Sequence, residues 1–232
     1  MSVLGIDQIT YSTDDLPLSR RFFQDWGLTL AGESADEMVF ECLNGCRVVV
    51  AAMGKPGLPP AIEDGPTLRE VVWGVESEAD LVRYADAIRG DAGFVDAVVD
   101  GARRIGCTDP NGLAVRLQVT RKRELTDIAS GVMNTWNSRT RVNQPAPIYD
   151  RATPIEVGHV VFFVADVKAV EAFYASRFGF VSSDRYPGRG AFMRCAPDGG
   201  HHDLFLLQLP SGKRGLNHVA FTVRDIHEVF GG

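Results

Sequence analysis

The sequence predicts an α+β protein built from paired βαβββ modules, because one eight-residue pattern occurs four times along the chain. The copies begin at Gln8, Glu70, His159 and His218 and end at Asp15, Ser77, Asp166 and Asp225. Apolar residues alternate within each copy, which is the period of a strand with one buried face. Each copy ends at a Ser or Asp suited to an N-cap, so a helix is expected after each strand.

The elements of the first half follow from periodicity and turn residues. The expected order is strand 5–12, helix 15–26, strands 38–42 and 47–53, strand 68–75, helix 78–89, and strands 94–99, 103–107 and 113–119. Leu81, Tyr84, Ala85 and Ile88 have the spacing of one buried helix face. The segment from Asp109 to Gly112 reads Asp-Pro-Asn-Gly, which is typical of a tight turn before the last strand.

The second half repeats this order but ends early. The expected elements are strand 157–164, helix 167–178, strands 180–185, 190–195 and 202–209, then strand 216–223 and a helix from Asp225. Residues 1–120 are therefore expected to form one domain of two modules, and residues 155–232 a second domain whose last module is incomplete. Residues 121–154 are expected to connect them and to lie against the first domain.

Composition limits the function classes. A chain of 232 residues with 45% hydrophobic and 23% charged residues is expected to fold into one or two ordinary cores. A net charge of −6 argues against nucleic acid or an anionic membrane as the main partner. The sequence has no long apolar run and no basic start followed by an apolar stretch, so a cytoplasmic protein with a small ligand is expected. The four cysteines lack disulfide or CxxC spacing and are expected to be reduced and buried.

Histidines mark the second half as the functional one. All five occur after residue 158, namely His159, His201, His202, His218 and His227. In their copies of the pattern, His159 and His218 alternate with the apolar positions, so both point away from the helix-covered face. If the two strands pair, the imidazoles converge, and converging histidines from distant segments commonly form metal sites.

These features resemble the vicinal oxygen chelate superfamily, which has the glyoxalase/bleomycin-resistance/dioxygenase fold. The resemblance rests on Gly158-His-Val, on His201-His-Asp-Leu204 and on Leu216-Asn-His-Val-Ala-Phe-Thr-Val223. Within the superfamily, the sequence is most similar to the two-domain type I extradiol dioxygenases, such as biphenyl-2,3-diol dioxygenases. The resemblance implies an enzyme of aromatic catabolism that cleaves a catechol-type ring next to its diol with O2, and that assembles as a homo-oligomer.

The resemblance also assigns roles to residues. It implies that His159 and His218 hold Fe(II), with Mn(II) as the alternative, and that His202 is the acid/base histidine. Because strand neighbours face opposite ways, only one of His201 and His202 is expected to face the site; His202 is preferred, and His201 is assigned to substrate binding. The first half resembles the metal-free half of the family, where Gln8 and Glu70 replace the ligands and Arg116 stands where a carboxylate would be.

The third ligand of the family, a glutamate, has no counterpart at the expected spacing. Arg116 follows Glu70 by 46 residues, and the same step from His218 passes beyond Gly232. The sequence is therefore expected to be a fragment of a longer product, or weakly active. Asp203 and Glu228 are poor substitutes, the first because it should point away if His202 points inward.

Two alternative functions remain open at the sequence level. One is a metal-dependent lyase or isomerase of the glyoxalase kind, which the adjacent His201 and His202 disfavour because such an enzyme needs a glutamate base there. The other is a non-catalytic small-ligand-binding protein of the bleomycin-resistance kind, which a site with only two histidines would favour.

Overall fold

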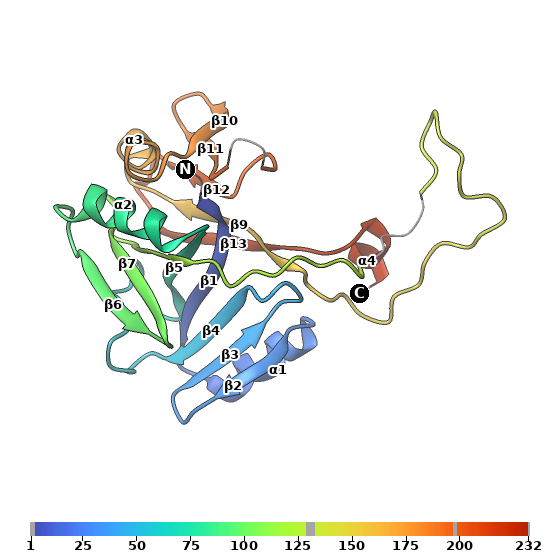
Figure 1. Cartoon of the computed structure of the whole chain (residues 1–232), viewed down its shortest axis with the longest axis horizontal. Helices are drawn as coiled ribbons and strands as arrows, with labels where there is room; N and C mark the ends of the chain where they lie inside the picture. The colour runs from blue at the N-terminus through green and yellow to red at the C-terminus, as the bar shows by residue number, and fades with distance from the viewer. Residues whose placement is uncertain (1–2, 129–132, 197–198, 232) are drawn as a thin grey trace.

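The computed structural model describes residues 3–128, 133–196 and 199–231, which form an α+β protein with two β-sheets (Figure 1). The first sheet has the strand order β2-β3-β4-β1-β5-β8-β7-β6, and the second has the order β10-β11-β12-β9-β13. In the first half the strands are β1 (Val3–Thr13), β2 (Thr29–Glu33), β3 (Glu37–Glu41), β4 (Arg47–Ala52), β5 (Thr67–Val75), β6 (Val95–Val99), β7 (Ala102–Thr108) and β8 (Ala114–Val119), and the helices are α1 (Leu16–Asp25) and α2 (Glu78–Ile88). In the second half they are β9 (Glu156–Phe163), β10 (Val181–Tyr186), β11 (Gly190–Arg194), β12 (Leu204–Leu207) and β13 (Gly215–Thr222), with α3 (Val167–Phe178) and α4 (Ile226–Gly231).

The repeated pattern lies on two neighbouring strands in each sheet, at the centre of the first sheet (β1 and β5) and at one edge of the second (β9 and β13). β1 pairs with β5 antiparallel and with β4 parallel, while β9 pairs with β13 antiparallel and with β12 parallel. The two copies in each half are therefore direct neighbours, as the convergence of His159 and His218 requires. The predicted fold class is confirmed.

The predicted N-caps are confirmed in all four copies. The Asp15 carboxylate accepts a hydrogen bond from Leu18 N at 2.8 Å, and Ser77 Oγ accepts one from Asp80 N at 3.2 Å. Asp166 Oδ1 accepts from Lys168 N and Ala169 N, and Asp225 Oδ1 accepts from Glu228 N. These bonds satisfy backbone donors that a helix leaves free, which is why each helix begins where its strand copy ends.

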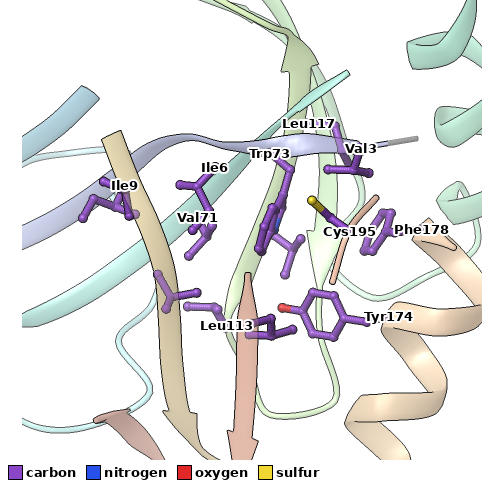
Figure 2. Close-up of a cluster of buried hydrophobic side chains, with 14 of the residues drawn as sticks. Val3, Ile6, Ile9, Val71, Trp73, Leu113, Leu117, Tyr174, Phe178 and Cys195 are labelled. Carbon is purple, nitrogen blue, oxygen red and sulfur yellow. The ribbon is translucent and has the colours of Figure 1, made fainter. Parts of the chain in front are cut away.

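Side chains from both halves share one core. Figure 2 shows Trp73 of β5 among Val71, Tyr174, Phe178 and Cys195. The Trp73 ring meets the Phe180 ring edge to face at 4.9 Å, and Tyr174 Oη donates to Asp109 Oδ2 at 3.3 Å. All four cysteines are free and buried, as predicted.

Three features differ from the sequence expectations. Strand β2, which lacks a strong apolar alternation, was not predicted, and it pairs with β3 at the edge of the first sheet. The predicted strand 202–209 is shorter and covers only Leu204–Leu207. The connecting segment contacts the first half where Arg121 N donates to Asp7. Further along, the segment projects away from both sheets (Figure 1), and Trp136 is 93% exposed. Residues 129–132 of that segment lie outside the described residues.

No helix among the described residues is long and apolar enough to cross a membrane.

Candidate metal centre

The two strand histidines of the second half meet on one face of the sheet. His159 lies opposite Ala220 and His218 opposite Val161 in the antiparallel pair β9–β13, with register shifts on each side of this region. Their Nε2 atoms are 3.2 Å apart, and their ring centroids are 5.3 Å apart at an interplanar angle of 73°. The structure therefore brings together the two residues that the sequence proposes as metal ligands.

This spacing fits a shared cation. Two imidazole nitrogens that are each about 2.1 Å from one ion lie about 3.0 Å apart at a right angle and about 3.4 Å apart in a tetrahedron. The observed 3.2 Å lies between these values. Within the part of the chain that the structure describes, no group of three His, Cys, Asp or Glu side chains is placed to hold a metal. Among the described residues, His159 and His218 are thus a pair of candidate ligands without a third side chain of this kind beside them.

His202 lies beside this pair. Its ring centroid is 4.3 Å from that of His159, and its Nδ1 atom is 3.0 Å from Nδ1 of His201. Phe192 of β11 packs against both rings, with centroids 5.2 Å from His201 and 5.0 Å from His202. The two residues do not lie on a strand, because β12 begins only at Leu204, so strand alternation does not set their directions. Only His202 of the two has its ring against His159 among the described contacts, and the assignment of roles to His202 and His201 stays a prediction.

The carboxylates considered as substitutes have other roles. Asp203 Oδ2 accepts a hydrogen bond from Cys195 N at 2.9 Å. Glu228 is fully buried and accepts from Thr153 N at 3.0 Å and Arg224 N at 2.7 Å. Both groups are therefore occupied in holding backbone segments in place.

Comparisons with known proteins agree with this geometry. Residues 156–231 match the Glyoxalase/Bleomycin resistance protein/Dioxygenase superfamily. Metapyrocatechase 2 of Cupriavidus necator is 37% identical over 229 residues, which is 98% of this chain and 68% of that protein. The chain belongs to the glyoxalase/bleomycin resistance protein/dioxygenase superfamily. The resemblance stated from the sequence is confirmed at this level.

Several solved structures share the fold. The Mn(II)-bound glyoxalase from Novosphingobium aromaticivorans has a TM-score of 0.76 at 19% identity, covering 99% of this chain and 69% of that one. A catechol 2,3-dioxygenase has a TM-score of 0.71 at 17% identity, over 100% of this chain and 74% of its own. BphC, a halotolerant catechol dioxygenase, has a TM-score of 0.69 at 21% identity, and the match covers 99% of this chain and 73% of that one. At these identities the likeness concerns the fold alone.

Two residues that support the site were missed by the sequence reasoning. Asn217 Oδ1 lies 2.8 Å from His218 Nδ1, and Glu63 Oε1 accepts a hydrogen bond from Leu216 N at 2.8 Å. An amide oxygen can only accept, so Asn217 holds the His218 proton on Nδ1 and leaves the Nε2 lone pair free for a cation. Asn217 could have been found because it precedes a candidate ligand, whereas Glu63 belongs to the first half and gave no such signal.

Replacing Asn217 with alanine is expected to weaken Mn(II) binding by about 10- to 100-fold, because His218 loses the group that fixes its tautomer. Affinity is measured by titrating the protein with Mn(II) and following the concentration of free Mn(II) by electron paramagnetic resonance. Asn217→Asp, which keeps an acceptor at the same place, is the matched control and should bind at least as well as the wild type. Equal affinity of Asn217→Ala and wild type would contradict the tautomer argument.

Burial, together with the neighbouring His202 and His218 rings, lowers the pKa of His159 to about 4. Burial, followed by the His201 charge, also lowers the pKa of His202. Desolvation penalises the protonated imidazole, so both rings are neutral near neutral pH. A neutral His159 has its ring lone pair available to a cation without first losing a proton.

The stability of the metal-free protein should therefore depend on pH through His159. An imidazole with a pKa near 6.5 when unfolded and about 4 when folded binds more protons in the unfolded chain between these values. Its contribution to stability is complete above about pH 6.5 and is lost as the pH falls towards 4. The free energy of unfolding is measured by urea unfolding at pH 7, 6 and 5. As the pH falls, this free energy is expected to decrease more in the wild type than in His159→Gln. A constant difference between the two across this range would refute the lowered pKa.

Proposed function

We propose that this chain is a non-haem Fe(II) extradiol dioxygenase that cleaves a catechol-type ring next to its diol with O2. The observation that carries the proposal is the 3.2 Å approach of the His159 and His218 Nε2 atoms with the His202 ring beside them. The similarity to Metapyrocatechase 2 supports an enzyme of this kind. We also propose that residues 1–120 form the metal-free domain and residues 155–232 the catalytic one, with residues 121–154 connecting them.

His159 and His218 would hold the cation through Nε2. When bound, the cation acidifies the catechol hydroxyls and couples the ring electronically to O2. Fe(II) is the preferred ion and Mn(II) the alternative, since imidazole nitrogens and oxygen ligands suit both. The two imidazoles are neutral donors, so the negative charge of a deprotonated diol would offset the charge of the ion.

His202 would move the proton. Its pKa is lowered by burial, so near neutral pH the ring is unprotonated and can accept a proton from a substrate hydroxyl. The neighbouring His201 ring, with its Nδ1 atom 3.0 Å from that of His202, would fix the His202 ring and contact the substrate. Phe192, which packs on both imidazoles, excludes water from one side of this pair.

The test is anaerobic reconstitution with ferrous iron, followed by addition of catechol and then air. A yellow ring-fission product is expected from the wild type, with a much smaller kcat in His202→Ala at unchanged iron content. His227→Gln changes a histidine outside this cluster and is the matched control, expected to retain activity. Product formation that persists in the double variant His159→Ala/His218→Ala would overturn the proposal.

One observation favours a second candidate function. The described residues bring only two ligands together, which suits a non-catalytic protein that binds a small ligand through a loosely held cation. Binding of catechol to the metal-loaded chain, without consumption of O2 in an oxygen-electrode assay, would select this alternative over the dioxygenase.

A further inference from the structure

A pocket lies in the first half, over β1 and β5, the strands that correspond to the histidine strands β9 and β13. This pocket has a volume of about 330 Å³ and is lined by residues of β1, β4, β5, β6, β7 and β8 and of the loop 55–59. Val49, Leu58, Val95, Ala97 and Val99 contribute apolar wall surface. Gln8 and Glu70, the residues that replace the two histidines of the repeated pattern, lie in its polar part with Arg104 and Arg116.

The polar floor holds two buried guanidinium groups against one carboxylate. Arg104 Nη1 is 3.3 Å from Glu70 Oε1, and Arg116 Nε is 3.4 Å from Glu70 Oε2. The three side chains are only 6%, 12% and 11% exposed, in the order Arg104, Arg116 and Glu70. The other acceptors of Arg104 are the neutral amide oxygens of Gln8 and Gln118. Among the groups in direct contact, the floor therefore carries one positive charge more than Glu70 neutralises. The next carboxylate, buried Asp7, is separated from Arg104 by Gln118, whose Nε2 donates to Asp7 Oδ2 at 2.9 Å.

The remaining charges at this pocket lie at its rim. Lys55 pairs with Glu37 at 2.6 Å, and Asp100 is exposed at the edge of the lining. Charges in contact with water are screened, whereas those on the floor are not, so the rim changes the floor potential little. The recorded bonds of Arg116 use Nε and Nη1, the latter to the carbonyl oxygens of Cys107 and Val115. Among the described residues, Arg116 Nη2 has no recorded partner and is the donor that a ligand would use.

We propose that this pocket binds a small organic carboxylate with an apolar body. An anion would neutralise the surplus guanidinium charge, and a carboxylate is an anion that arginine donors bind well. The apolar walls favour an organic carboxylate over inorganic phosphate, which has no apolar part to cover. The apolar walls would cover the rest of the molecule, and the volume suits a ligand of roughly the size of one substituted ring. The two pattern positions that carry His159 and His218 in the second half thus carry Gln8 and Glu70 at an anion-binding pocket in the first.

The test is calorimetric titration of the 232-residue chain, without added metal, with benzoate, benzamide and inorganic phosphate as probes. Benzoate is expected to bind to the wild type. Benzamide and phosphate are each expected to bind at least tenfold more weakly than benzoate. Arg116→Gln and Ala97→Trp, which fills the pocket from its exposed wall, should each weaken benzoate at least tenfold. Their matched controls, Arg103→Gln and Val98→Trp, change neighbouring residues that do not line the pocket and should bind benzoate as the wild type does.

Several outcomes would overturn the proposal, and they are independent of the dioxygenase proposal. Absence of benzoate binding, or equal binding in Ala97→Trp, would show that the pocket is not the site. Phosphate binding as tight as benzoate binding would show that charge alone is recognised. Loss of benzoate binding in His159→Ala would move the site to the second half, whereas unchanged binding in that variant keeps it in the first. If Arg116→Gln does not fold, Ala97→Trp with its Val98→Trp control decides the question.

Discussion

Replacing either His159 or His218 with alanine is expected to lower the affinity for Fe(II) or Mn(II) by more than about 100-fold. Loss of a residue that only hydrogen-bonds to a metal ligand lowers affinity by up to about 100-fold, and loss of the ligand itself should cost more. The reason is that each residue supplies one of the two nitrogens that the structure holds 3.2 Å apart. The measurement is anaerobic titration calorimetry or, for Mn(II), the free-ion signal in electron paramagnetic resonance.

The control for this prediction is His227→Gln, which removes an imidazole of α4 from the chain without touching the pair. Its affinity should equal that of the wild type. The double variant should bind the ion only slightly more weakly than the weaker of the two single variants. The reason is that the one imidazole left in a single variant already holds the ion poorly. Affinity within threefold of the wild type in either single variant would show that the cation lies elsewhere.

Replacing Trp73 with alanine is expected to lower the free energy of unfolding by about 3 to 5 kcal/mol. Trp73 is 1% exposed and fills the core between the two halves (Figure 2). Its ring meets that of Phe180 at 4.9 Å. A cavity there removes packing from side chains of both sheets. Urea unfolding followed by far-ultraviolet circular dichroism measures the change.

Trp73→Phe is the matched variant and should cost much less. Trp73 Nε1 is buried without a hydrogen-bond partner among the described residues, so phenylalanine keeps an aromatic ring while removing an unpaired donor that costs roughly 1 to 3 kcal/mol. A loss below 1 kcal/mol in Trp73→Ala would show that this shared core contributes little, and a larger loss in Trp73→Phe than in Trp73→Ala would contradict the packing argument.

The fold could be predicted largely because it is repeated. A strand period of two followed by a capping residue is a local signal, and four copies of it made the modules visible despite their different residues. Strand β2 and the short β12 were predicted poorly, because edge pairing and bends depend on neighbours distant in the sequence. The path of residues 133–150 was also unpredictable. The large apolar side chain of Trp136 suggests burial, but the sequence does not show whether a surface is available to cover it.

The candidate site was predictable only in part. The convergence of His159 and His218 follows from their matched positions in two neighbouring strands. The positions of His201 and His202 could not be predicted from the strand pattern, because both residues precede the strand and both rings contact Phe192. Asn217 and Glu63 act through hydrogen bonds that no periodicity reveals. The roles of these histidines stay predictions until metal binding is measured.

The hydrogen bond from Leu216 N to Glu63 has a consequence for evolution. Glu63 precedes Leu216 by 153 residues, and the bond fixes the start of the strand on which His218 lies. Gly215 lies against the same carboxylate and has a positive φ of 137°, so a larger residue would displace Glu63. If His218 holds a cation as proposed, a change in the loop around residue 63 would alter cation binding without changing His218 itself. Sequence drift in the first half would then be constrained by selection on the second, and the two halves would be expected to diversify together.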